Sequence, residues 1–183
     1  MVFDQNEYKI DLVNKLVPCS DDIKVSALLK YNDGILTVEY EVVEKELRRV
    51  ILNDNDKVYT DSCCELFIGN KDSYVNFELS ASTAMLIGKG KDRYERILFP
   101  LDIVKRVKRS IKVIEETEYK VHYKLTMEIR LEDFDINIDN NLSFNLYKCG
   151  DLLKEPHYLT AFPITNGKVD YHQSQFFAPL ALS

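Results

Sequence analysis

Apolar and polar residues alternate along most of the chain, which is the pattern of strands rather than helices. Residues 24–31 and 35–43 alternate on either side of Asn-Asp-Gly, a combination that predicts a β-hairpin. Residues 110–116 and 119–129 flank Glu-Thr-Glu and predict a second hairpin. Further segments with strand character are 7–16, 50–52, 84–87 and 142–149.

The stretch from Tyr59 to Ala81 places polar residues inside two otherwise apolar strands, joined by a polar turn at 69–73. Successive side chains of a strand point to opposite faces. This parity predicts one shared surface formed by Glu65, Asn76, Glu78, Asn145 and Tyr147. An unpaired buried polar group costs roughly 1–3 kcal/mol, so a buried polar row would be a candidate site. The alternative is that the row is simply the solvated face of an antiparallel sheet.

Short strands with turn signals every few residues predict an all-β fold, a two-sheet antiparallel β-sandwich with at most one or two short helices. One helix is expected after Pro100, with the basic run Lys105 to Lys112 on its solvated face. Residues 131–134 predict one helical turn. A length of 183 residues suits a single domain over 1–183.

Composition narrows the classes of function. A net charge of −6 gives no general attraction to phosphate backbones, so we expect no nucleic-acid partner. No apolar run approaches the roughly 20 residues that span a bilayer, so no membrane span is expected. The amino terminus lacks the features of a secretory signal, which predicts a cytoplasmic protein unless a leader was removed.

The four cysteines show no spacing typical of a metal site or a redox motif. Cys63 and Cys64 are adjacent in a predicted strand and would point to opposite faces. We therefore expect buried free thiols at Cys63, Cys64, Cys149 and Cys19.

Three kinds of residue surround the predicted polar surface: carboxylates and amides, arginines and aromatic rings. Arg93 and Arg96 leave a glycine-rich turn that starts at Gly88. A pyranose offers apolar C–H faces for aromatic stacking and hydroxyls for carboxylate, amide and guanidinium groups. This mixture of side chains is typical of sugar recognition, although core packing alone would also explain the aromatic residues.

Five segments in order carry a resemblance to a known family: YTDSCCELFI, YVNFELSASTAMLIGKGKDR, FNLYKCG, HYLTAFPI and VDYHQSQFFAPLAL. Over about Tyr59 to Leu182 the chain resembles the family 9 carbohydrate-binding modules, in the single-domain group of the DOMON-like superfamily. The amino-terminal third resembles the family only in its pattern.

The resemblance implies a β-sandwich without catalytic activity that binds the end of a glycan in a shallow cleft between two aromatic rings. Those rings are tryptophans in sugar-binding members, whereas this chain has none, and the matching positions are Tyr59 and Tyr171. Glu65 matches a glutamate that receives sugar hydroxyls, and Glu78 stands where a sugar-binding member has an arginine. The candidate ligand-binding residues are Tyr59, Glu65, Asn76, Glu78, Arg93, Arg96, Asn145, Tyr147, His157, Tyr171 and His172.

No cofactor is required, but members of the family often hold structural calcium, and the oxygen-rich loop 53–56 is where such an ion would bind. Turn formation alone also explains the composition of that loop. The sequence does not predict an oligomeric state.

Three alternative functions stay open. Glu65 and Glu78, on paired strands, would suit a retaining glycosidase if their carboxyl groups lie about 5–5.5 Å apart. A scaffold domain with a degenerate sugar site is the second alternative. The third is a haem or redox DOMON-like domain, which needs an axial His and Met. Its candidates are His122, His157, His172, Met85 and Met127.

Overall fold

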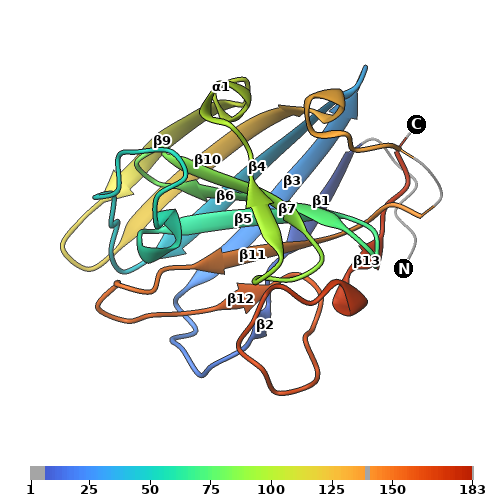
Figure 1. The fold of residues 1–183 in the computed structure, drawn as a ribbon. Coiled ribbons are helices and arrows are strands. Elements are labelled where there is room, and N and C mark those ends of the chain that lie inside the picture. The colour runs from blue at the N-terminus through green and yellow to red at the C-terminus, as the bar shows by residue number, and fades with distance from the viewer. Residues whose placement is uncertain (1–6, 139–140, 183) are drawn as a thin grey trace.

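A computed structural model describes residues 7–138 and 141–182, and in this part of the chain thirteen strands form two antiparallel sheets (Figure 1). The five-stranded sheet has the order β1 (Glu7–Asp11), β3 (Lys24–Asn32), β4 (Ile35–Glu44), β10 (Val121–Arg130) and β9 (Lys108–Glu116). The second sheet has the order β2 (Asn14–Lys15), β12 (Leu159–Thr160), β11 (Ser143–Cys149), β5 (Cys63–Gly69), β6 (Tyr74–Ser80), β7 (Met85–Gly90) and β8 (Arg96–Leu98), and β13 (Ala178–Pro179) pairs with β11.

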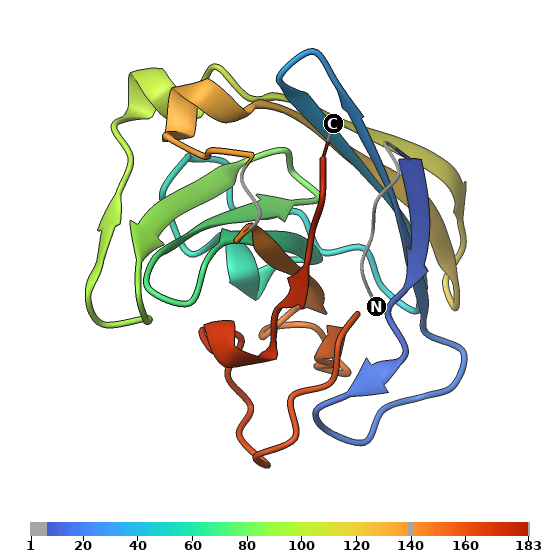
Figure 2. The same cartoon turned by 90° about the vertical axis from the view of Figure 1, so that its right-hand side faces the viewer.

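Helical structure in the described residues is limited to α1 (Leu101–Val104) and three 3₁₀ turns, η1 (Val58–Thr60), η2 (Leu131–Phe134) and η3 (Ser174–Phe176). Figure 2, turned by 90°, shows the two sheets as separate layers. The predicted all-β, two-sheet antiparallel sandwich is therefore confirmed, including the helical turn at 131–134.

The five-stranded sheet is amphipathic. Along β4 and β10 every second side chain is buried, and its neighbours are more exposed. The β3–β4 hairpin turns on Asp33 and Gly34, whose φ angles are 47° and 76°. Positive φ at both turn residues matches the right-handed twist of the flanking strands, which is why Asp-Gly specifies this hairpin.

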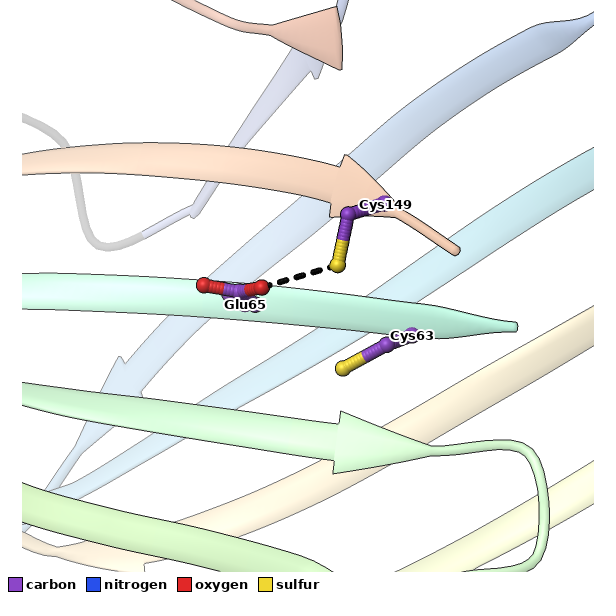
Figure 3. Close-up of side chains that lie close together, drawn as sticks. All are labelled: Cys63, Glu65 and Cys149. Atoms are coloured by element: carbon purple, nitrogen blue, oxygen red, sulfur yellow. Dashed lines mark hydrogen bonds between the residues drawn. The ribbon is translucent and has the colours of Figure 1, made fainter. Parts of the chain in front are cut away.

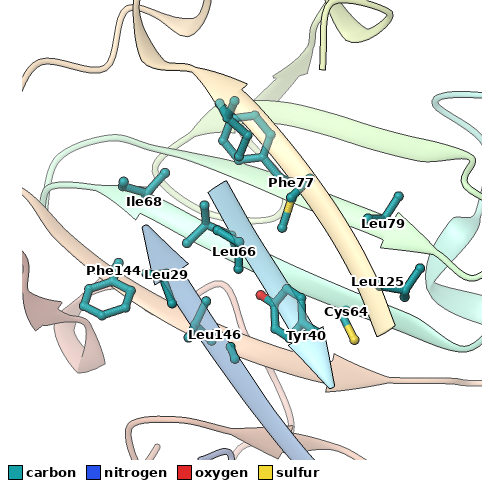
Figure 4. Packing of buried hydrophobic residues seen from close by; sticks show 14 of the residues in the cluster. Leu29, Tyr40, Cys64, Leu66, Ile68, Phe77, Leu79, Leu125, Phe144 and Leu146 are labelled. Atoms are coloured by element: carbon teal, nitrogen blue, oxygen red, sulfur yellow. The ribbon is translucent and has the colours of Figure 1, made fainter. Parts of the chain in front are cut away.

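The second sheet is buried on both faces, because β5, β6 and β11 carry buried side chains at almost every position. Residues such as Leu66 and Phe77 pack into the core between the sheets (Figure 4). The alternate residues face outward: Glu65 lies opposite Glu78 on β6 and opposite Tyr147 on β11.

The predicted shared surface is confirmed by this register, since Phe67 in turn lies opposite Asn76 and Asn145. All five predicted polar-row residues are at most 3% exposed. The reading of the row as a simple solvated face is therefore wrong, because loops cover it.

A buried ionic cluster joins the two sheets, and the sequence did not predict it. Lys148 of β11 points into the core, and its Nζ lies 2.8 Å from Glu44 Oε2 at the end of β4. His157 Nε2 lies 3.0 Å from the same oxygen, and the Tyr123 hydroxyl donates to Glu44 Oε1 at 2.6 Å. Burial alone would raise the pKa of Glu44, but Lys148 and His157 lower it to about 2.

Two local predictions were wrong. Residues 50–52 form no strand, because the amides of Val50 and Ile51 donate to the buried Asp61 carboxylate instead of to a neighbouring strand. The basic run is not the face of a helix: α1 ends at Val104, and β9 carries the later part. There Arg109 forms two hydrogen bonds with Asp54, at 2.6 and 2.8 Å.

No helix in the described part of the chain is long and apolar enough to cross a membrane.

Replacing Lys148 with Met should destabilise the protein by roughly 3–5 kcal/mol, because the substitution leaves the Glu44 charge buried without its lysine. The free energy of unfolding from urea titrations measures this loss. Lys124→Met is the matched control, because Lys124 and Glu39 form a partly exposed pair at 2.6 Å that should contribute less than about 1 kcal/mol. The double variant Glu44→Gln with Lys148→Met should recover much of the loss, and equal losses in the two lysine variants would contradict the assignment.

Acid should weaken the same cluster. Because folding depresses the pKa of Glu44 from its ordinary 4.5 to about 2, its stabilisation is complete above pH 4.5 and disappears as the pH falls through about 2. The shift corresponds to roughly 3 kcal/mol. The measurement is the stability difference between the parent and Glu44→Gln at several pH values, and a difference that stays constant from pH 6 to pH 2 would contradict the prediction.

Candidate functional site

A cavity of about 490 Å³ lies on the outer face of the second sheet. Seven of the eleven predicted site residues line it: Tyr59, Glu65, Glu78, Arg93, Arg96, Tyr171 and His172. Such a volume is within the usual range for small-molecule sites. The structure therefore gathers most of the predicted site in one place.

Outward-facing residues of neighbouring strands form the floor of this cavity. Glu65 and Glu78 face outward from the paired strands β5 and β6, and Arg96 begins β8, two strands away from β6. Gly88 on the intervening β7 lets Arg96 reach across, because a Cβ at Gly88 would lie 3.2 Å from Arg96 Cδ. It would also lie 3.0 Å from Asn76 Oδ1, so the positions of both Arg96 and Asn76 require a residue without a side chain at Gly88.

Glu78 is held by two donors. Its Oε1 accepts from Arg96 Nη1 at 2.9 Å and from Asn76 Nδ2 at 2.8 Å. Its Oε2 is buried and has no hydrogen-bond partner among the described residues. Burial raises the pKa of Glu78, and Arg96 opposes that rise. Arg96 thus neutralises a carboxylate that burial would otherwise strongly disfavour.

Glu65, the cross-strand neighbour of Glu78, is buried to a similar degree, at 3% exposure. The Cys149 thiol donates to its Oε1 at 3.0 Å, and Cys63 lies beside Cys149 at the same end of the glutamate (Figure 3). Burial, together with the neighbouring Glu78, raises the pKa of Glu65 well above its ordinary value. A carboxyl group in this state can donate a hydrogen bond as well as accept one.

Tyr171 forms part of the cavity wall and is also a packed core residue, at 8% exposure. Its ring stacks on Tyr147, with centroids 4.1 Å apart and an interplanar angle of 13°. Its hydroxyl donates to the Lys148 carbonyl at 2.8 Å. Tyr171 is therefore fixed by the fold, unlike a ring on a surface loop.

His172 and Arg93 complete the predicted set. Burial lowers the pKa of His172 to about 3, and both Arg96 and Arg93 act in the same direction. The ring is therefore neutral at neutral pH, and its Nδ1 shares a hydrogen bond of 2.8 Å with the Tyr74 hydroxyl. Arg93 lies 3.5 Å from Asp170 and is about half exposed.

Four predicted site residues do not line the cavity. Asn145 uses its amide on the backbone of Phe162 and Leu146, and Tyr147 supports Tyr171 from behind. Asn76 acts through Glu78. His157 belongs to the Glu44–Lys148 cluster and lines a separate cavity, so the structure does not bring it together with the other predicted site residues.

Sequence reasoning missed six further lining residues: Cys149, Asp151, Tyr158, Tyr94, Val169 and Asp170. Most lie within or next to the segments that carried the family resemblance, so their proximity in sequence was the available signal. Burial, with Asp151 beside it, raises the pKa of Tyr158 to about 12.

The loop 53–56 fits calcium poorly. Arg109 occupies both carboxylate oxygens of Asp54, and the Ile87 amide donates to the side-chain oxygen of Asn55. The Lys57 amide donates to Asp56. These contacts already occupy the oxygens that a calcium ion would need. Calcium binding by this loop stays a prediction that the structure does not favour.

A family model described as carbohydrate-binding family 9 matches residues 7–182. The chain belongs to carbohydrate-binding family 9. The match confirms the family resemblance and carbohydrate binding as the class of function. No curated protein sequence matches the chain.

Solved structures agree with the family. A protein from Bacteroides uniformis ATCC 8492 that is proposed to bind carbohydrate is 28% identical, with a TM-score of 0.80 over 95% of this chain and 84% of that one. A family 9 module from Caldicellulosiruptor kristjanssonii in complex with cellotriose is 14% identical, with a TM-score of 0.60 over 96% and 82%. A module from that organism in complex with glucose is 15% identical, with a TM-score of 0.58 over 100% and 95%. At these identities the two modules support the fold.

Tyr171→Ala should destabilise the protein by about 3–5 kcal/mol, because it removes a buried stacked ring. Tyr171→Phe keeps the ring, loses one hydrogen bond and should cost only about 1 kcal/mol. Tyr94→Ala is the matched control, since Tyr94 lines the same cavity but is 87% exposed, and its effect should stay within about 0.5 kcal/mol. Chemical denaturation measures all three, and an unaltered Tyr171→Ala protein would contradict the structural role of the ring.

Proposed function

We propose that this family 9 chain binds one terminal sugar residue of a glycan, or a free small sugar, in the 490 Å³ cavity and performs no catalysis there. The observation that carries the proposal is the convergence of Tyr59, Arg96 and the Glu65–Glu78 pair on a single cavity. Ring faces, a guanidinium group and carboxyl groups are the partners that a pyranose requires.

The charges of the cavity favour a neutral sugar. Arg96 is paired with Glu78 at 2.9 Å, and Arg93 faces Asp170 at 3.5 Å. Asp151 adds a further carboxyl group to the wall. Among the described lining residues, both arginines therefore already face an acidic side chain, and a uronic acid would meet no free positive charge. The glucose and cellotriose bound to the related modules are consistent with a neutral glucosyl unit.

The carboxyl pair is held in a manner that suits binding rather than glycosidic cleavage. Glu78 Oε1 already accepts two hydrogen bonds, and its Oε2 is fully buried. Glu65 is 3% exposed. A glycosidase needs two carboxyl groups that both reach the scissile bond, and Glu78 presents no open oxygen for that approach.

Tyr59→Ala should weaken sugar binding about tenfold, because a ring that stacks on a sugar contributes roughly 0.5–1.5 kcal/mol beyond its area. Calorimetric titrations of glucose, cellobiose and cellotriose measure the effect. Nearly equal affinities for the three sugars are expected if one terminal unit fills the site, and glucuronate should bind more weakly than glucose.

Tyr119→Ala is the matched control, since Tyr119 is 76% exposed and does not line the cavity. It should bind like the parent. Affinity that rises steadily with chain length would refute binding at a chain end. New reducing ends in cellotriose incubated with the protein would refute the absence of catalysis.

A further inference from the structure

Two thiols and a carboxyl group converge beneath the cavity. Cys63 of β5 and Cys149 of β11 are register partners in adjacent strands, and Glu65 is the next outward-facing residue of β5. One ligand atom from each residue lies within 4.8 Å of the others, and Cys149 Sγ lies 3.0 Å from Glu65 Oε1. Figure 3 shows the two cysteines on neighbouring strands at the same end of the glutamate.

This arrangement differs from the ordinary burial of cysteine as a small apolar residue. Cys64, the neighbour of Cys63, shows the ordinary case, because it points into the main core with Leu66 and Ile68. Cys63 and Cys149 face the other side, where they share a buried carboxyl group. Two sulfurs and one carboxylate oxygen form a ligand set that zinc and related thiophilic cations prefer, whereas calcium and magnesium prefer oxygen alone.

The spacing suits a tetrahedral ion. A Zn–S bond of about 2.3 Å places tetrahedral ligand atoms roughly 3.5–4 Å apart, so small side-chain rotations within the observed 4.8 Å limit are sufficient. The strands β5 and β11 hold the three backbones in a fixed register. An ion would therefore meet a site that is already organised.

A second observation points to a missing positive charge. Glu78, the cross-strand neighbour of Glu65, is 2% exposed, and its Oε2 is buried without a hydrogen-bond partner in the described structure. Of these two adjacent carboxyl groups, Glu78 is paired with Arg96 at 2.9 Å, and no ion pair to Glu65 is found among the described residues. Access exists as well, because Glu65 and Cys149 both line the cavity.

We propose that Cys63, Cys149 and Glu65 bind a thiophilic divalent cation of the zinc type, with its fourth coordination position open to the cavity. On binding, the two thiol S–H bonds break, and the O–H bond of Glu65 breaks wherever its carboxyl group is protonated. The protons pass to water, and the sulfur lone pairs form metal–sulfur bonds as hydration waters leave the ion. The carboxylate supplies the third ligand. This inference does not depend on sugar binding and is tested without sugar.

The test is a titration of the full, reduced chain with Co²⁺, whose thiolate charge-transfer and ligand-field absorption bands report sulfur ligands and tetrahedral geometry. The expected result is one Co²⁺ per chain, displaced by added Zn²⁺. Cys63→Ser and Cys149→Ser should abolish the thiolate band, and Glu65→Gln should weaken binding roughly tenfold or more. Cys19→Ser, which removes a thiol outside the site, should bind Co²⁺ like the parent.

Far-UV circular dichroism of each variant checks that it is folded, and the change in Tm on adding Zn²⁺ gives a second measure of binding. Zn²⁺ should raise the Tm of the parent and of Cys19→Ser, but not of Cys149→Ser. The proposal is overturned if the parent shows no thiolate band, if the band persists without Cys63 and Cys149, or if it disappears in Cys19→Ser.

Discussion

The structure depends on a sheet that is covered on both faces. In β5, β6 and β11 the side chains point alternately into the core and to the outer face, and almost all of them are buried on both sides. Polar residues on the outer face must therefore find partners inside the protein. Glu78 accepts hydrogen bonds from Arg96 and Asn76, and Glu65 accepts one from Cys149. These two glutamates form part of the floor of the cavity.

The first sheet supports this floor through the core. Lys148 of β11 is bound by Glu44 of β4, and the Tyr40 hydroxyl of β4 donates to the Glu65 carbonyl at 2.6 Å. Both contacts join a strand beneath the cavity, β11 or β5, to β4 of the five-stranded sheet. Binding groups held on rigid strands are placed more accurately than groups on loops alone, and the site combines both kinds of support.

Strand parity explains why so much of the site was predictable from sequence. Alternation alone assigned Glu65 and Glu78 to one face, and the family motifs located Tyr59 and Tyr171. In the strand 143–149 alternation puts Lys148 on the same face as Leu146, but it gives no information on the partner that stabilises a buried lysine. Glu44 lies more than a hundred positions earlier, at the start of a charged stretch, 44–49, whose sequence favours no particular secondary structure. The place of His157 in the Glu44–Lys148 cluster was not predicted for the same reason, since a residue's partner depends on tertiary packing. The helix predicted over the basic run at 105–112 was wrong, because in so short a segment the spacing of apolar residues does not distinguish a helix from a strand.

The chain order of the strands has a consequence for synthesis. The central strand β5 pairs with β6 immediately, but its other neighbour is β11, and Glu65 and Cys149 are 84 positions apart. While a ribosome makes the intervening residues, β5 keeps one edge without hydrogen-bond partners, and such edges template pairing between chains. Closing so distant a pair also slows folding. The strand β11, which supplies Cys149 to the cavity, is therefore also the strand that covers the exposed edge of β5 in the nascent chain.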